Sequence, residues 1–175
     1  MEQKENSLND RLPVLLVVFS YHHNNTEKIA NAFARVLDAQ IKTPQQIRPE
    51  ELQEYDLVGF GSGIDSGKHY KELLDLADQL PHVTERKAFI FSTYGIPAFF
   101  STFSNIDAMG KSQHLSLREK LQSRGYIIVD EFACAGFNTN SFLRYIGGLN
   151  KGRPNAKDLR RAEEFARKLK QSIRS

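Results

Sequence analysis

The chain has 175 residues, a formal net charge of +3, one cysteine and no tryptophan. This length suffices for one domain that buries a core without disulfides, and a lone cysteine excludes an internal disulfide and any cysteine-based metal cluster. No apolar run reaches the roughly 20 residues of a membrane-spanning helix. Residues 1–12 are polar and of mixed charge, so we expect a flexible N-terminal tail, a single domain over residues 13–175 and a cytoplasmic protein.

The charge is unevenly spread. The stretch Arg144–Ser175 holds ten Lys or Arg and three Asp or Glu, whereas the rest of the chain is acidic on balance. Such a split is typical either of a solvated basic helix or of a surface that docks a partner or nucleic acid. The sequence leaves both interpretations open, although it favours the solvated helix.

Apolar runs alternate with helical patterns along the chain. We expect strands at Pro13–Phe19, Ala39–Thr43, Asp56–Gly61, Lys87–Thr93 and Tyr126–Ala133, and helices at Asn25–Leu37, Lys68–Leu80, Leu115–Ser123 and Ala156–Ile173. Asn24 and Glu27, three residues apart, resemble a capping box at the start of the first helix. This alternation predicts an α/β fold, a parallel sheet with helices on both faces, and a ligand site beyond the carboxyl ends of the strands.

The loop after the first strand is the best candidate site. Its residues are Ser20, Tyr21, His22, His23, Asn24, Asn25 and Thr26. The loop leads into a helix, so unpaired backbone N–H groups and the helix dipole meet there and favour an anion such as phosphate. Because the loop has no Lys or Arg, neutral donors would hold that anion. The alternative is a polar helix cap without a ligand.

Two further loops follow strands at the same expected edge. After the third strand comes GSGIDSG, whose glycines at positions 61, 63 and 67 allow backbone to approach a flat ligand. After the fourth comes STYGIPAFF, in which Tyr94 is suited to stacking on a ring. Each loop taken alone is equally compatible with ordinary turn and packing roles.

Other phosphate motifs are absent from the sequence. No GxxxxGK[ST] occurs, and GFGSGI has Ile64 where a dinucleotide fingerprint needs glycine. A phosphotransfer receiver domain would need an acid at the end of the first strand, where Phe19 and Ser20 stand.

With these residues the chain resembles the flavodoxin family from about Pro13 to Lys170. The resemblance rests on SYHHNNTEKIA, VGFGSGIDSGKHYKELL, FIFSTYG and GGLNKGRPNAKDLRRAEEFA. It implies a three-layer flavodoxin-like sandwich with a five-stranded parallel sheet in the order 2-1-3-4-5 and non-covalently bound flavin mononucleotide (FMN) as cofactor. The family usually has glycine at the position of Asn24, and asparagine tolerates the positive φ that such a turn needs.

The resemblance also implies roles for single residues. The loop from Ser20 to Thr26 would surround the phosphate. The ring would be bordered by Ser62, Gly63, Ile64, Asp65, Ser66 and Gly67 and covered by Thr93, Tyr94 and Gly95. Asp65 is either a carboxylate that opposes negative charge on the ring or an exposed turn residue. In this interpretation no side chain is a catalytic acid, base or nucleophile.

The resemblance implies electron transfer to or from a redox partner protein. The alternatives are an FMN-dependent NAD(P)H or quinone reductase, or a flavin-free interaction domain. The Phe-rich segment Pro97–Ser112 is a candidate lid, partner patch or homodimer contact. We expect no metal site at His22 and His23, a surface or cap position for His114, and a buried apolar role for Cys134.

Overall fold

The computed structural model describes residues 13–21, 23–95, 110–139 and 141–174. The strands are β1 (Val14–Phe19), β2 (Gln40–Lys42), β3 (Leu57–Asp65), β4 (Lys68–His69), β5 (Arg86–Tyr94) and β6 (Tyr126–Ala135). The helices are α1 (Asn25–Leu37), α2 (Lys71–Gln79), α4 (Leu115–Ser123) and α5 (Ala156–Arg174), with 3₁₀ turns η1 (Pro44–Gln46), η2 (Pro49–Glu54) and η4 (Ser141–Ile146). The predicted tail, His22 and most of the Phe-rich segment lie outside the described residues.

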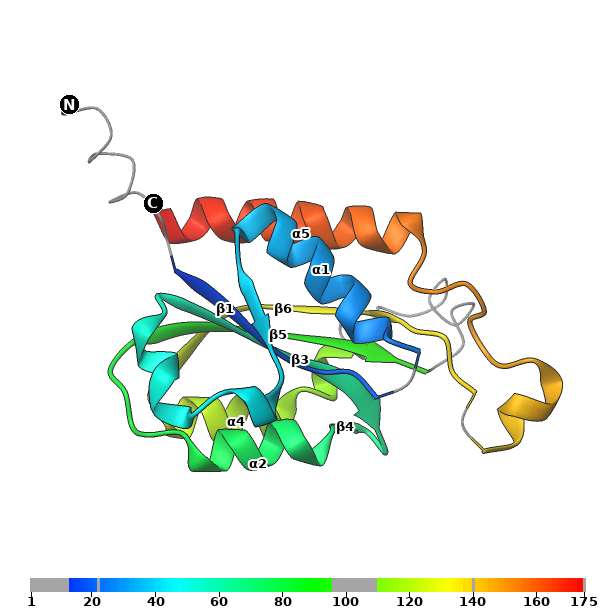
Figure 1. The fold of residues 1–175 in the computed structure, drawn as a ribbon, viewed down its shortest axis with the longest axis horizontal. Helices are drawn as coiled ribbons and strands as arrows, with labels where there is room; N and C mark the ends of the chain where they lie inside the picture. Colours follow the sequence, from blue (N-terminus) through cyan, green and yellow to red (C-terminus); the bar gives the residue numbers. More distant parts are fainter. Residues whose placement is uncertain (1–12, 22, 96–109, 140, 175) are drawn as a thin grey trace.

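The sheet has the predicted order. Its five parallel strands run β2-β1-β3-β5-β6, which is the order 2-1-3-4-5 when β4 is left aside. Strand β4 is an addition that pairs antiparallel with the end of β3. Figure 1 shows α1 and α5 on one face of the sheet and α2 and α4 on the other. The protein is therefore a three-layer α/β sandwich.

Alternating side chains of the strands fill two cores. In β1, Leu16 and Val18 belong to the core under α1 and α5, whereas Leu15 and Val17 belong to the core under α2 and α4. This alternation follows from the two-residue period of a strand. Because both faces are covered, β1 is a continuous apolar run rather than an alternating one.

Aromatic rings dominate the core between α1, α5 and the sheet. Phe33 of α1 is wholly buried and meets Phe89, Phe91 and Phe132 edge-on at ring-centroid distances of 5.1–5.6 Å. The neighbouring strand β3 makes room with glycine, since a Cβ at Gly61 would lie 2.1 Å from the Phe91 ring. Gly61 is thus a packing residue within β3, not the loop glycine that the sequence predicted.

The segment after β3 is a tight hairpin rather than a loop. Strand β3 continues to Asp65, and Ser66 (φ 50°) and Gly67 (φ 79°) form the turn into β4. Positive φ at both central residues is the requirement of a type I′ turn. The helix predicted from Lys68 consequently begins at Lys71.

The predicted capping box at α1 is wrong. Asn24 has left-handed backbone angles (φ 52°, ψ 30°) and makes no side-chain cap hydrogen bond. A capping residue needs extended backbone for its side chain to reach back to the helix N–H groups. The expected tolerance of positive φ at Asn24 is confirmed.

Candidate functional site

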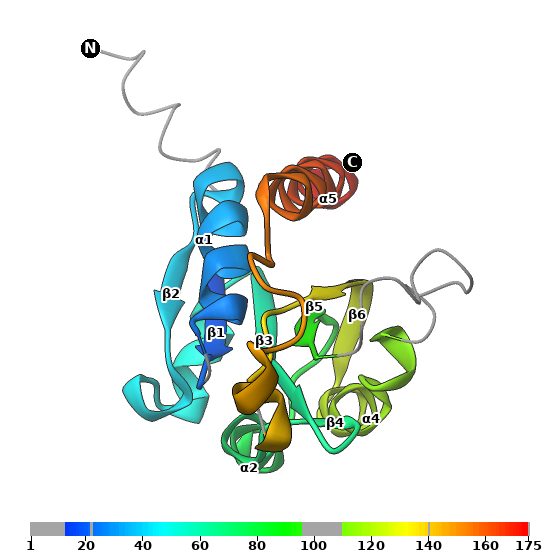
Figure 2. The ribbon, with the colours of Figure 1, turned by 90° about the vertical axis from the view of Figure 1, so that its right-hand side faces the viewer.

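A pocket lies where the carboxyl ends of β1, β3, β5 and β6 meet. Figure 2 views the molecule onto this edge of the sheet. The residues that line the pocket are Ser20, Tyr21, Asn25, Thr26, Gly63, Ile64, Tyr70, Thr93, Tyr94, Gly95, Gly136, Phe137 and Asn138. Residues from all three predicted loops thus lie around one pocket. Other predicted site residues in the described part of the chain are not among its lining: His23, Asn24, Ser62, Asp65, Ser66 and Gly67.

The first wall is the N-terminus of α1. Two consecutive left-handed residues, His23 (φ 55°) and Asn24 (φ 52°), turn the chain into the helix. The first helical hydrogen bond runs from Lys28 N–H to Asn24 C=O at 3.0 Å. The N–H groups of Asn25, Thr26 and Glu27 precede it and have no acceptor within the helix. They form the donor set that favours an anion.

Two buried side chains tie this wall to the rest of the pocket. The hydroxyls of Thr26 and Thr93 are 2.8 Å apart, which joins α1 to the end of β5. Asn25 Nδ2 donates to the Phe137 carbonyl at 2.8 Å, whereas Asn25 Oδ1 is buried without a hydrogen-bond partner. An unpaired buried acceptor is costly, so Asn25 Oδ1 offers a place for a ligand hydroxyl or N–H group.

The second wall combines the β3–β4 hairpin with aromatic rings. Tyr70 lies 6.2 Å from Tyr21 and 5.5 Å from Phe19, measured between ring centroids. Tyr21 is 68% exposed, and a flat ligand ring could lie against it. By contrast, Tyr94 is only 4% exposed and packs with Ala133 and Ala135.

The third wall follows β6 and was missed from the sequence. It consists of Gly136, Phe137 and Asn138, and His23 reaches it through a 2.8 Å contact with Thr139 and a 4.5 Å ring contact with Phe137. This wall could have been predicted, because the expected strand at β6 ends at the same edge of the sheet as β1, β3 and β5. Tyr70 was not predicted as a site residue because its segment has the sequence pattern of the start of a helix.

No Lys, Arg, His, Asp or Glu lines this pocket among the described residues. Burial, followed by the nearby Asp65 carboxylate, raises the pKa of Tyr70, so its hydroxyl stays protonated. Asp65 itself is exposed at the hairpin turn. The pocket therefore offers neutral donors, one orphaned acceptor and aromatic surface.

Sequence comparison relates this chain to an archaeal protein. No protein-family model matches the chain. The uncharacterized protein MJ0298 of Methanocaldococcus jannaschii is 42% identical over 158 residues, which cover 90% of this chain and 98% of that protein. The chain belongs to the family of this archaeal protein.

Solved structures share the fold at low sequence identity. Oxidised flavodoxin 2 from Bacillus cereus superposes with a TM-score of 0.65 at 18% identity, over 91% of this chain and 99% of that one. The apo form of an NADH:FMN oxidoreductase (EMOB) gives a TM-score of 0.52 at 17% identity, over 90% and 89% of the two chains. The fold is thus flavodoxin-like, as the sequence predicted.

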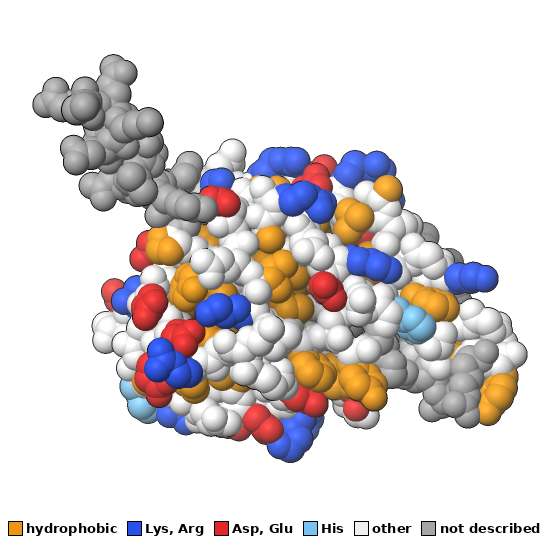
Figure 3. Space-filling model, viewed as in Figure 1, with side chains coloured by type: hydrophobic (Ala, Val, Ile, Leu, Met, Phe, Trp, Pro, Cys, Tyr) orange, Lys and Arg blue, Asp and Glu red, His pale blue; other side chains and the backbone are white. Residues whose placement is uncertain are grey.

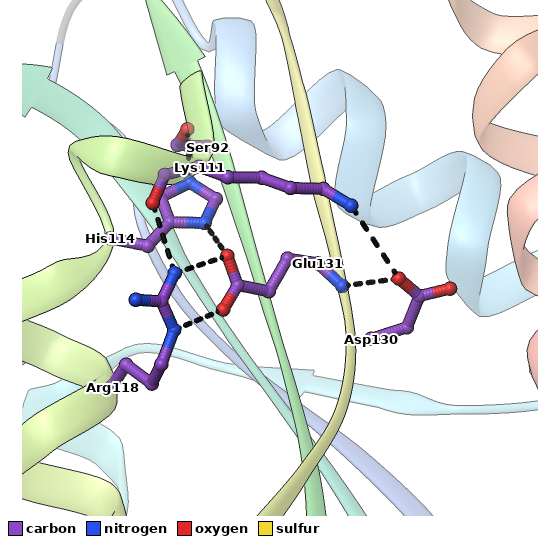
Figure 4. Close-up of polar contacts among 6 residues, drawn as sticks. All are labelled: Ser92, Lys111, His114, Arg118, Asp130 and Glu131. Atoms are coloured by element: carbon purple, nitrogen blue, oxygen red, sulfur yellow. Dashed lines mark hydrogen bonds and ion pairs between the residues drawn. The ribbon is translucent and has the colours of Figure 1, made fainter. Parts of the chain in front are cut away.

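The flavodoxin-like sheet carries a second polar cluster, drawn in Figure 4. His114 Nε2 lies 2.7 Å from the Ser92 hydroxyl, and His114 Nδ1 lies 3.0 Å from Glu131 Oε2. Arg118 donates to both oxygens of Glu131 at 2.5 and 2.9 Å. His114 is wholly buried, so the predicted surface position is wrong. The alternative prediction of a cap position is confirmed, because His114 is the N-cap residue of α4, although its side chain makes no cap hydrogen bond.

The basic C-terminal helix α5 also contains acidic side chains that pair with basic ones. Figure 3 shows Lys and Arg side chains along the upper edge of the molecule, where α5 runs, with acidic groups between them. Glu163 pairs with Arg35 at 3.2 Å and with Arg167 at 3.3 Å. This pairing favours the solvated interpretation of the basic helix.

The described residues contain no group of three or more His, Cys, Asp or Glu side chains that could hold a metal ion. None of their helices is long and apolar enough to cross a membrane. Cys134 is buried in the core under α1 and α5, as predicted.

Proposed function

We propose that this protein binds FMN non-covalently in the pocket at the carboxyl ends of the strands and carries electrons to or from a redox partner protein. The observation that carries the proposal is the combination, in one pocket, of a free helix N-terminus, an orphaned buried acceptor and aromatic surface. These three features match the three parts of FMN: its phosphate, its hydroxylated chain and its flat ring.

The residues present fit the cofactor. The N–H groups that open α1 and the hydroxyl of Ser20 would hold the phosphate without a basic side chain. Asn25 Oδ1 would accept a hydrogen bond from a ribityl hydroxyl. Tyr21, Tyr70 and the hairpin residues Gly63 and Ile64 would border the ring, with Thr93, Tyr94 and Gly95 on its other edge. FMN would supply the redox chemistry, which no side chain of the pocket offers.

A fluorescence titration tests the proposal. We expect the flavin-stripped protein to quench FMN fluorescence at one saturable site, and to bind riboflavin at least about tenfold more weakly because riboflavin lacks the phosphate. Equal affinity for FMN and riboflavin would contradict the role of α1. No binding of either at tens of micromolar flavin would favour the flavin-free interaction domain.

Replacing Thr26 with alanine is expected to weaken FMN binding several-fold. The substitution removes the 2.8 Å contact with Thr93 that fixes the start of α1 against β5. Thr26→Ser keeps the hydroxyl and serves as the matched control. If Thr26→Ala and Thr26→Ser bind FMN equally well, the hydroxyl contact does not support the site.

The alternative function is an FMN-dependent reductase of NAD(P)H or quinones. The fold shared with an NADH:FMN oxidoreductase favours testing it. NAD(P)H oxidation by the FMN-loaded protein alone would support the reductase. Electron exchange with a redox protein, without NAD(P)H oxidation, would support the carrier.

A further inference from the structure

Ser62 lies at the centre of a buried hydrogen-bond node behind the second wall of the pocket. Its hydroxyl is wholly buried and has three partners. It donates to the Gly63 carbonyl at 2.7 Å, accepts from the Tyr70 backbone N–H at 3.2 Å, and lies 2.8 Å from His69 Nδ1. One oxygen atom thus joins β3, β4 and the residue that precedes α2.

Counting protons assigns the tautomer of His69. A serine hydroxyl has one proton, and here it goes to the Gly63 carbonyl. The proton between Ser62 and His69 must therefore come from His69 Nδ1. That leaves His69 Nε2 with a lone pair, and this atom is buried without a hydrogen-bond partner.

This node acts directly on the pocket. Gly63 and Tyr70 both line the pocket. The Gly63 carbonyl accepts a hydrogen bond from the Ser62 hydroxyl, and the Tyr70 backbone N–H donates one to it. The Tyr70 ring rests on the bare backbone of Gly63, since a Cβ there would lie 2.9 Å from Tyr70 Cε2. A shift of the Ser62 hydroxyl would therefore move the carbonyl and the ring that form this wall.

We propose that Ser62 and His69 are a positioning pair, which sets the orientation of the Gly63 peptide and of the Tyr70 ring in the pocket wall. In its effect on affinity, the inference rests on the proposed function. His69 transmits no charge in this role, because it serves as a neutral hydrogen-bond donor to Ser62.

His69 packs against the second polar cluster. Its ring lies 5.0 Å from that of His114, whose hydrogen-bond partners are Ser92 and Glu131. Burial, followed by the neighbouring His114, lowers the pKa of His69 well below its usual 6.5, against the opposing effect of Glu131. Arg118 already pairs with that carboxylate. His69 consequently remains neutral through the physiological range.

Ser92 provides a matched control for the test. It pairs with Ser62 across β3 and β5, is equally buried, and makes an equivalent 2.7 Å contact with a histidine, but it is not among the residues that line the pocket. We expect Ser62→Ala to weaken FMN binding about tenfold and Ser92→Ala to leave it within about twofold. His69→Asn keeps a side-chain N–H near the position of Nδ1 and should retain more affinity than His69→Leu. Equal effects of Ser62→Ala and Ser92→Ala, whether both weaken binding or neither does, would overturn the proposal.

NMR of the flavin-free protein gives a second readout that needs no ligand. Imidazole ¹⁵N shifts should show His69 as the Nδ1–H tautomer from pH 8 to about 6. The Tyr70 amide and ring signals should move in Ser62→Ala and stay in place in Ser92→Ala. If wild type fails to bind FMN but these signals behave as stated, the proposed function fails and the positioning pair stands. An Nε2–H tautomer, or unmoved Tyr70 signals, would overturn the pair.

Discussion

Replacing Phe33 with alanine is expected to lower the free energy of unfolding by about 3–5 kcal/mol. Phe33 is wholly buried, contacts three phenylalanines of the sheet edge-on and lies 5.5 Å from Phe165 of α5. Alanine would leave a cavity bounded by rings from three separate elements, and such a cavity cannot collapse without shifting the strands. Urea unfolding followed by circular dichroism measures the loss.

Lys28→Ala is the control, because Lys28 is exposed on the same helix. Its effect should stay within about 0.5 kcal/mol. A loss below about 1.5 kcal/mol for Phe33→Ala would mean that α1 and α5 close the gap, and that the aromatic cluster is less rigid than its edge-on geometry indicates.

The helices and strand order follow from patterns that are local in the sequence. The apolar run of β1 and the stripe of α1 each fill one element, and alternation with right-handed crossovers leaves few ways to order the strands. Asn25–Leu37 and Leu115–Ser123 were therefore predicted with their observed bounds. Strand β4 has only two residues, Lys68 and His69, and so short a segment has no period that separates it from the helix that follows.

The hydrogen bonds of His114 could not be predicted from the sequence for a different reason. Its partners Ser92 and Glu131 lie 22 and 17 residues away in the chain, and no local pattern around His114 indicates either of them. Its burial depends on both contacts, since an unpaired imidazole would be driven to the surface. Likewise, Ser62 reads as part of a glycine-rich loop until β4 brings His69 against it.

Glu131→Gln is expected to cost about 2–3 kcal/mol of stability at pH 7, because it leaves Arg118 without the carboxylate to which it is bound. The side chain of Glu131 is 10% exposed, and it accepts hydrogen bonds from Arg118 and from His114 Nδ1–H. A carboxylate can only accept, so the proton in the contact with His114 belongs to the histidine. The variant keeps the shape of the side chain and removes its charge.

The same contacts predict how this cost depends on pH. Burial raises the pKa of Glu131, but the hydrogen bonds from His114 and Arg118 outweigh it and lower the pKa to about 2, against an ordinary value of 4.5. The difference corresponds to about 3 kcal/mol. Because the folded-state pKa is depressed, this stabilisation is complete above about pH 4.5 and is lost as the pH falls toward 2.

Urea unfolding of wild type and Glu131→Gln at several pH values between 7 and 2.5 tests this linkage. The stability difference between the two proteins should be constant from pH 7 to about 5 and then shrink as the pH falls. Asp130→Asn is the matched control: Asp130 is the neighbouring, half-exposed acid, 3.9 Å from Lys111, and the amide can still accept the Glu131 N–H. Its difference from wild type should be small. A Glu131→Gln difference that stays constant down to pH 2.5 would show that the charge of Glu131 is not what binds β6 to α4.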